Sequence, residues 1–183
     1  MRLFIGLDIP EKIKSSLAQL QESLKNNGVK GHWKRTENMH LTLEFLGELE
    51  PSTTPVLSEI INKVANQHHS FKLSIENLGA FPSFTRPHTL WVGSGKGVDK
   101  LIDLQQLLHS ELLSAGFKLD ARSYKPHFTI ASKPQIFGID LSSYKDVNIG
   151  CFSVNELILY ESKVEQGKRV YNALYKEKLI SAD

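Results

Sequence analysis

Residues 40–43 read His-Leu-Thr-Leu, and residues 127–130 read His-Phe-Thr-Ile. Each stretch alternates polar and apolar residues, which is typical of a β-strand with one buried face, so the His and the Thr of each stretch share the other face. With seven His in 183 residues, a His two places before a Thr is expected about 0.3 times by chance, and motif matches carry that risk. Two such stretches therefore indicate a duplicated site that presents an imidazole and a hydroxyl together.

The segments around the two stretches also match each other. Residues 3–46 align with residues 90–133 without a gap, so that Leu3-Phe4-Ile5-Gly6 falls on Leu90-Trp91-Val92-Gly93. The order of strand, helix and motif strand then occurs twice, and internal repeats of this kind indicate architecture. We expect one bilobal α+β domain over 1–183 whose two pseudo-symmetric lobes face each other across a central cleft. The alternative is that two lobes share a common layout and the agreement of the His and Thr positions is accidental.

Hydrophobic periodicity and turn residues predict the individual elements. Strands are expected at 3–9, 39–46, 71–75, 89–93, 127–133, 154–160 and 170–174, and residues 79–87 read as a loop. Three amphipathic helices are expected, the first after Pro10. Their buried stripes are Ile13, Leu17, Leu20 and Leu24; Leu57, Ile60, Ile61 and Val64; and Leu101, Leu104, Leu108 and Leu112.

Composition limits the possible functions. The chain is 40% apolar and 23% charged with a net charge of +2, which is ordinary for a folded domain and too weakly basic for a protein that binds through many phosphate contacts. Cys151 is the only cysteine, so it forms neither an internal disulfide nor a thiolate zinc site. The first residues are apolar too briefly for a signal peptide, and no stretch approaches the ~20 apolar residues of a membrane span. These features are typical of a cytoplasmic enzyme or binding protein, and no obligate protein partner is evident.

Two imidazoles that face one pocket make an acid–base pair near neutral pH, because the pKa of histidine is about 6.5 in the absence of perturbation. One ring would be neutral and the other protonated. Uncharged Thr hydroxyls can donate hydrogen bonds to the non-bridging oxygens of a phosphate, which gain charge at the transition state. The Asp residues are scattered without ligand spacing, so we expect neither a metal nor another cofactor.

The other histidines lack a Thr two residues later. His68 and His69 end a predicted helix, where cations suit the helix dipole. His109 is expected at a solvated or boundary position of the third helix, and His32 and His88 are expected to be structural. Neither a Gly-x-Ser-x-Gly nucleophile motif nor a phosphate-binding Gly-x-x-x-x-Gly-Lys loop occurs in the sequence.

Several features together resemble the two-histidine (2H) phosphoesterase superfamily. They are the paired tetrads, Trp33, the run at 40–47, the Phe81-Pro82 pair, the Trp91 strand and the run at 126–130. Within this superfamily the sequence is most similar to the bacterial and archaeal RNA 2′,3′-cyclic phosphodiesterases, also called 2′-5′ RNA ligases. The resemblance covers nearly the whole chain. It implies an antiparallel sheet with outer helices in each lobe, chemistry without a metal, and opening of a 2′,3′-cyclic phosphate at an RNA end to leave a 2′-phosphate.

The resemblance also implies roles for single residues. His40 would be the proton donor to the leaving 3′ oxygen, His127 would accept the proton of the attacking water, and Thr42 and Thr129 would hold the phosphoryl oxygens. Relatives often carry an Arg shortly after the second tetrad, whereas this sequence has Lys133. If the strand stays regular, Lys133 shares the His127 face and meets the phosphate; otherwise it is a solvated strand end.

Trp33, Phe81 and Phe84 are candidates to stack on a base, although packing in the core or in a loop is the more usual role for each. Two further functions stay open at this point. One is a module that binds RNA ends or nucleotides without turnover, and the other is a 2′-5′ RNA ligase that acts by the reverse chemistry. A purely structural role for both histidines predicts that their replacement changes melting temperature far more than ligand affinity.

Overall fold

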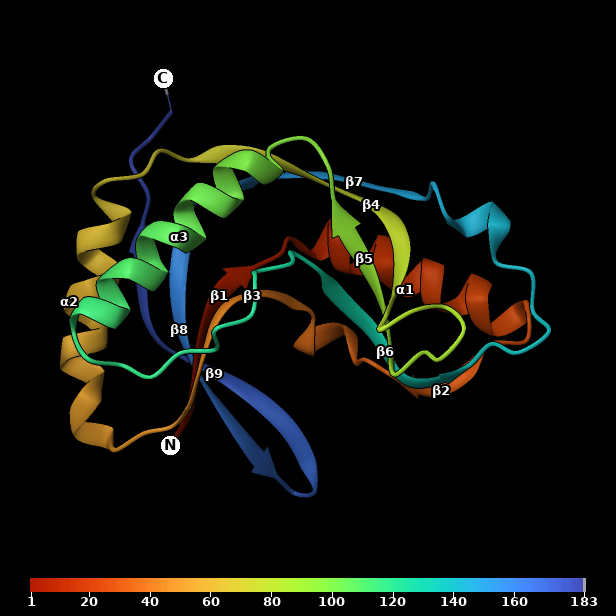
Figure 1. The fold of residues 1–183 in the computed structure, drawn as a ribbon, viewed down its shortest axis with the longest axis horizontal. Coiled ribbons are helices and arrows are strands. Elements are labelled where there is room, and N and C mark those ends of the chain that lie inside the picture. Colours follow the sequence, from red (N-terminus) through yellow and green to blue (C-terminus); the bar gives the residue numbers. More distant parts are fainter. Residues whose placement is uncertain (183) are drawn as a thin grey trace.

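Two antiparallel sheets form the frame of the molecule (Figure 1) in the computed structural model, which describes residues 1–182. One sheet has four strands in the order β3-β1-β8-β9, and the other has five in the order β2-β6-β5-β4-β7. The strands are β1 (Arg2–Asp8), β2 (Lys30–Trp33), β3 (His40–Glu48), β4 (Phe71–Phe81), β5 (Thr89–Ser94), β6 (Phe128–Gln135), β7 (Asn148–Val154), β8 (Glu156–Glu165) and β9 (Lys168–Lys178). The predicted α+β class with two sheets is confirmed.

The two motif strands occupy corresponding places. β3 pairs antiparallel with β1, and β6 pairs antiparallel with β5. Both β1 and β5 are followed by a long helix, α1 (Glu11–Asn26) and α3 (Val98–Ser114). This agreement supports the interpretation that 3–46 and 90–133 are related as a repeat.

The helices join the two sheets into one body. α1 follows β1 of the four-stranded sheet but contacts β7 of the five-stranded sheet, whereas α3 follows β5 of the five-stranded sheet and contacts β3 of the other. α2 (Thr54–Ala65) packs against α3 and β8, and Figure 1 shows both helices on the outer side of the four-stranded sheet. All three predicted apolar stripes are buried. Because each half contributes a helix to the other half, one hydrophobic core spans both sheets and holds their relative position.

A β-bulge determines which side chains of β3 face the cleft. Thr42 lies opposite Gly6 and Glu44 lies opposite Ile5, so Leu43 is an extra residue in the pairing. The bulge turns Glu44 toward α3, where it is buried, although simple alternation would put it on the face of Thr42. Gly6 permits the close pairing there, since a Cβ at residue 6 would lie 2.6 Å from the Leu41 carbonyl oxygen.

Three details differ from the predicted elements. β2 and β7 were not expected, because they are short or interrupted by glycine and lack a clear apolar alternation. β4 continues to Phe81, through residues that read as the start of a loop. Gly79 is needed inside this strand because the Trp91 ring lies against it, and a Cβ at residue 79 would collide with that ring.

Candidate active site

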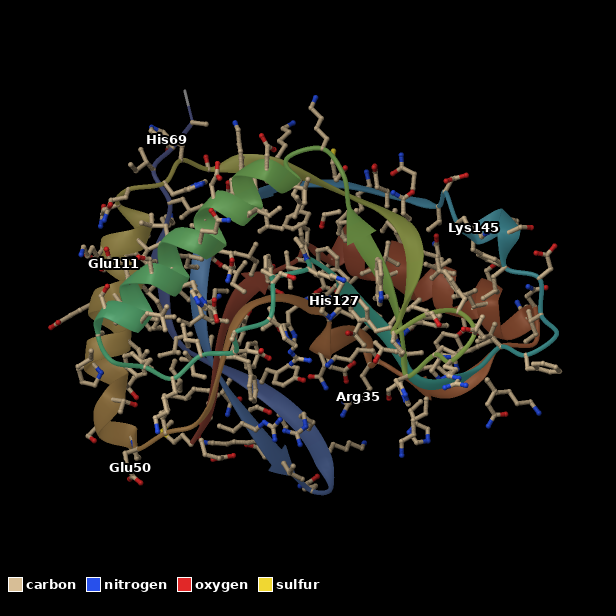
Figure 2. All side chains as sticks on the ribbon, viewed as in Figure 1. Arg35, Glu50, His69, Glu111, His127 and Lys145 are labelled. Atoms are coloured by element: carbon tan, nitrogen blue, oxygen red, sulfur yellow. The ribbon has the colours of Figure 1, made fainter. Side chains whose placement is uncertain are left out.

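The four residues of the paired motif line one cavity. This cavity, which we call the catalytic cavity, has a volume of about 390 Å³ and includes His40, Thr42, His127 and Thr129. His40 and Thr42 come from β3 of the four-stranded sheet, whereas Thr129 comes from β6 of the five-stranded sheet and His127 immediately precedes it. Figure 2 shows His127 near the middle of the molecule, between the two sheets. The cavity is therefore lined from both sides.

Both imidazoles are held in the same way. The Nδ1 atom of His40 lies 2.9 Å from the carbonyl oxygen of Asn38, and that of His127 lies 2.7 Å from the carbonyl oxygen of Lys125. In each case the carbonyl belongs to the residue two positions earlier. Because a carbonyl oxygen only accepts hydrogen bonds, Nδ1 must carry the proton, and Nε2 is the nitrogen that gains or loses a proton.

Aromatic rings fix the two imidazoles in place. The His40 ring stacks on Phe4, with centroids 4.7 Å apart, and meets the edge of Tyr171 at 4.8 Å. The Nε2 atom of His40 lies 3.0 Å from the Thr42 hydroxyl oxygen, so the neutral ring accepts a hydrogen bond from that hydroxyl. The His127 ring packs edge-on against Phe81 at 4.9 Å.

Cationic side chains complete the catalytic cavity. Lys34, which follows β2, and Arg169 of β9 line it together with Arg2 of β1. The Lys34 ammonium donates a hydrogen bond to the Tyr171 hydroxyl at 3.0 Å. These residues were not predicted as site residues because they lie outside the two tetrads. The only signal for one of them is alternation along β9, which places Arg169 and Tyr171 on one face.

The structure does not place Lys133 in the catalytic cavity. β6 has a bulge at Ile130, where its pairing with β5 shifts by one residue, so the regular alternation that would have put the Lys133 side chain beside Thr129 ends before Lys133, whose own backbone has φ +49°. The Lys133 side chain is exposed, and its backbone N–H donates to the His88 carbonyl oxygen. The expectation that Lys133 meets a phosphate in this cavity is therefore wrong, and the cationic side chains that line the cavity come from other elements.

Burial, together with the nearby Lys34 ammonium, lowers the pKa of His40 to about 4. The unfolded chain takes up this proton near pH 6.5, so the free energy of unfolding decreases as the pH falls from 7 toward 4. At pH 5 this difference in pKa lowers the free energy of unfolding by about 2 kcal/mol relative to its value at high pH. We expect His40→Gln to lose about 2 kcal/mol less stability than the wild type between pH 8 and pH 5, measured by urea denaturation. An identical pH dependence of the two proteins would contradict this.

The three aromatic candidates for base stacking lie in different places. Trp33 lies in a neighbouring cavity on one side, and Phe81 lines a different cavity on the other side that it shares with His127. Phe84 is partly exposed and lines none of these three cavities, as far as residues 1–182 show.

The remaining histidines lie elsewhere. His32 lines the cavity of Trp33, and His88 lines the cavity of Phe81. His109 lies within α3 and is half-buried, and its Nδ1 atom lies 2.6 Å from the buried Glu44 carboxylate. Within residues 1–182 no group of three His, Cys, Asp or Glu side chains is arranged to hold a metal ion. No helix in the same range is long and apolar enough to cross a membrane.

Comparison with known proteins identifies the family of the chain. Residues 7–91 match the family model described as LigT like Phosphoesterase. The RNA 2′,3′-cyclic phosphodiesterase of Methanocaldococcus jannaschii is 32% identical over 182 residues, which cover 95% of this chain and 98% of that protein. The protein of the same name from Aeropyrum pernix is 31% identical and covers 91% of this chain and 96% of its own length.

Solved structures show the same fold. The crystal structure of E. coli LigT complexed with 3′-AMP superposes with a TM-score of 0.83 at 24% identity and covers 97% of both chains. The apo form of E. coli LigT gives a TM-score of 0.80 at 23% identity, covering 98% of this chain and 97% of that chain.

Proposed function

The chain belongs to the LigT-like phosphoesterase family of the 2H superfamily, and from this premise we propose that it opens 2′,3′-cyclic phosphates at RNA ends with His40 as general acid and His127 as general base. It is a phosphodiesterase, and its substrate is an RNA end that carries the cyclic phosphate. The observation that carries the proposal is the single cavity lined by both imidazoles and both Thr hydroxyls.

The proposed reaction is an in-line displacement at phosphorus. The Nε2 atom of His127 accepts a proton from water as the water oxygen attacks the phosphorus. The bond from phosphorus to O3′ breaks, and the Nε2 atom of His40 gives its proton to O3′, so the phosphate stays on O2′. Each positioned proton-transfer group contributes about 10²–10⁴-fold to the rate. After product release, one proton must return from His127 to His40 through solvent.

The low pKa of His40 has a direct consequence for its proposed role. In the free protein this ring is neutral at pH 7, since its pKa is about 4, and a neutral ring cannot act as an acid. A bound phosphate anion about 4 Å away adds roughly 4 kcal/mol of attraction to the protonated ring at an effective dielectric constant near 20. This attraction is enough to raise the pKa of His40 back to near neutral pH. Substrate binding therefore creates the acid.

The hydroxyls and cations of the catalytic cavity would hold the phosphoryl group. Thr42 has a second role in this scheme, because its hydroxyl is already hydrogen-bonded to His40 Nε2. When His40 becomes protonated, that hydroxyl is released to donate to a phosphoryl oxygen. Thr129 would donate from the opposite sheet. Lys34 and Arg169, which line the same cavity, would balance the negative charge that develops on the oxygens.

The product identifies the reaction. An oligoribonucleotide that ends in a 2′,3′-cyclic phosphate is incubated with the protein and excess chelator, and the product is compared with 2′- and 3′-phosphate standards by chromatography. We expect the 2′-phosphate as the product, formed at the same rate with and without the chelator. A 3′-phosphate product would contradict the breaking of the O3′ bond. Tight binding with no product after a long incubation would instead establish a binding module.

A further inference from the structure

Two cavities of opposite chemistry flank the catalytic cavity. We call the first the basic groove: it has a volume of about 380 Å³, includes Arg35 and Lys168, and shares Lys34, Thr129, Arg169 and Tyr171 with the catalytic cavity. We call the second the apolar pocket: it has a volume of about 720 Å³, includes Phe81, Pro82 and Tyr124, and shares Thr42, Phe45 and His127 with the catalytic cavity. The three cavities therefore form one continuous path across the cleft.

The basic groove carries a local excess of positive charge. Lys34, Arg35, Lys168 and Arg169 line it, and within residues 1–182 only one carboxylate, that of Glu37, forms an ion pair with any of them, namely with Arg35. Trp33 adds an aromatic ring to the groove. The apolar pocket carries less positive charge, because Asp120 and Arg122 pair with each other and Lys125 is the remaining lysine or arginine in its lining. A polyanion is thus attracted to the basic groove and less so to the apolar pocket.

The outer wall of the basic groove is a well-formed hairpin. β8 and β9 pair up to Glu165 and Lys168, and the two turn residues, Gln166 and Gly167, both have positive φ, as a type I′ turn requires. Figure 1 shows this hairpin extending away from the body of the molecule. Lys168 and Arg169 therefore stand at its tip, where they are available to a ligand that enters the cavity.

The two imidazoles contact different flanks, and His127 also lines its flanking cavity, whereas His40 reaches the basic groove only through its neighbours. His40 bonds to the carbonyl of Asn38 and contacts the Tyr171 ring, and both of these residues line the basic groove. His127 contacts Phe81 of the apolar pocket and lines that pocket itself. In an in-line displacement the attacking and leaving oxygens lie on opposite sides of the phosphorus. The leaving O3′, beside His40, is therefore on the groove side.

We propose that the RNA strand lies in the basic groove, with the internucleotide phosphate next to the cyclic end held by Arg35 and Lys168. The inference rests on the proposed function, since it uses the assignment of His40 as the acid. The ribose of the last nucleotide carries O3′, so it sits on the side of His40, and the strand that precedes it continues into the groove. The attacking oxygen approaches from the side of His127 and the apolar pocket.

The same placement makes the apolar pocket the side from which any other nucleophile would come. If the 5′-hydroxyl of a second RNA replaces water, its oxygen attacks phosphorus, its proton goes to His127, and O3′ takes the proton of His40. A 2′-5′ bond then forms with the two histidines in unchanged roles, so joining does not require the exchange of roles that reverse chemistry implies.

The test compares a short and a long substrate. We measure kcat/KM for a cyclic mononucleotide and for a hexaribonucleotide that ends in a 2′,3′-cyclic phosphate. Each is measured at about 50 mM and about 200 mM salt, because binding through phosphate contacts weakens over this range. Lys168→Glu is expected to lower kcat/KM for the hexanucleotide about tenfold. The slope of log kcat/KM against log salt concentration should also become shallower by about one, which corresponds to the loss of one phosphate contact. The same variant should leave the mononucleotide unchanged, because Lys168 does not line the catalytic cavity.

Two variants with the same or a similar charge change serve as controls. Arg122→Glu changes the apolar pocket, and Lys145→Glu changes a surface position far from His127 in Figure 2; neither should affect either substrate. An equal loss for both substrates with Lys168→Glu, or no loss, would overturn the proposal. A selective loss with Arg122→Glu would mean that the strand runs the other way.

Failure of the proposed function looks different. If the wild type hydrolyses neither the mononucleotide nor the hexanucleotide, the chemistry is wrong. The basic groove is then judged by binding of the hexanucleotide, measured by fluorescence anisotropy. Weaker binding by Lys168→Glu but not by Arg122→Glu would still support the groove, and equal binding by all three proteins would overturn it.

Discussion

Replacing His127 or His40 with alanine is expected to lower kcat about 10³-fold for a 2′,3′-cyclic phosphate substrate, within the range of positioned acid–base groups. Both rings line the catalytic cavity, and each is oriented by a carbonyl at Nδ1, so that Nε2 is the nitrogen that transfers the proton. The double variant should lose far less than the product of the two single losses, because groups that act as a unit are not additive. The wild type should show a bell-shaped pH profile whose two pKa values belong to the pair.

His32→Ala and His88→Ala are matched controls. Both imidazoles lie in cavities that adjoin the catalytic cavity, but neither lines it. We expect kcat to change less than about threefold, as for substitutions outside special features. If His40→Ala and His127→Ala instead lower the melting temperature and leave kcat intact, both histidines are structural and the proposed mechanism fails.

Lys34→Met is expected to lower kcat/KM about 100-fold, comparable to the loss of one preorganised donor to a developing oxyanion. Lys34 is one of the cations in the catalytic cavity, and its charge also helps to lower the pKa of His40, after the larger effect of burial. Loss of the ammonium should therefore raise the pKa of His40 in the free protein. NMR titration of the His40 ring measures this rise independently of turnover.

Lys30→Met provides the control for Lys34→Met. Lys30 begins β2, the strand that Lys34 follows, is exposed, and is absent from the linings of the three cavities. It should leave both kcat/KM and the pKa of His40 unchanged. A Lys34→Met protein with wild-type kcat/KM would show that Lys34 does not act on the phosphate.

Alternation along a strand explains why the tetrads could be predicted from the sequence. His40 and Thr42 share a face because β3 is regular between them, and the same holds for the start of β6. The amphipathic helices were also readable, because their apolar stripes follow the helical period. What the alternation cannot show is which sheet a helix covers. The crossing of α1 and α3 to the opposite sheets is a tertiary property.

Other parts of the site depend on backbone irregularities. The bulge at Ile130 and the positive φ of Lys133 remove the Lys133 side chain from the face of Thr129, and nothing in the residue types around them predicts that change. Arg169 and Tyr171 reach the catalytic cavity on a hairpin that lies outside the two repeated segments. Lys34 follows a strand of four residues, which is too short to give a periodic signal.

The central claim is that His40 and His127 act on one phosphate. Titration of the protein, labelled with ¹⁵N in its histidines, with a nucleoside 2′-phosphate tests it most directly. We expect the Nε2 signals of both rings to shift along a single binding curve, with His40 gaining a proton as the phosphate binds. A shift of only one ring, or two curves with different dissociation constants, would contradict the claim.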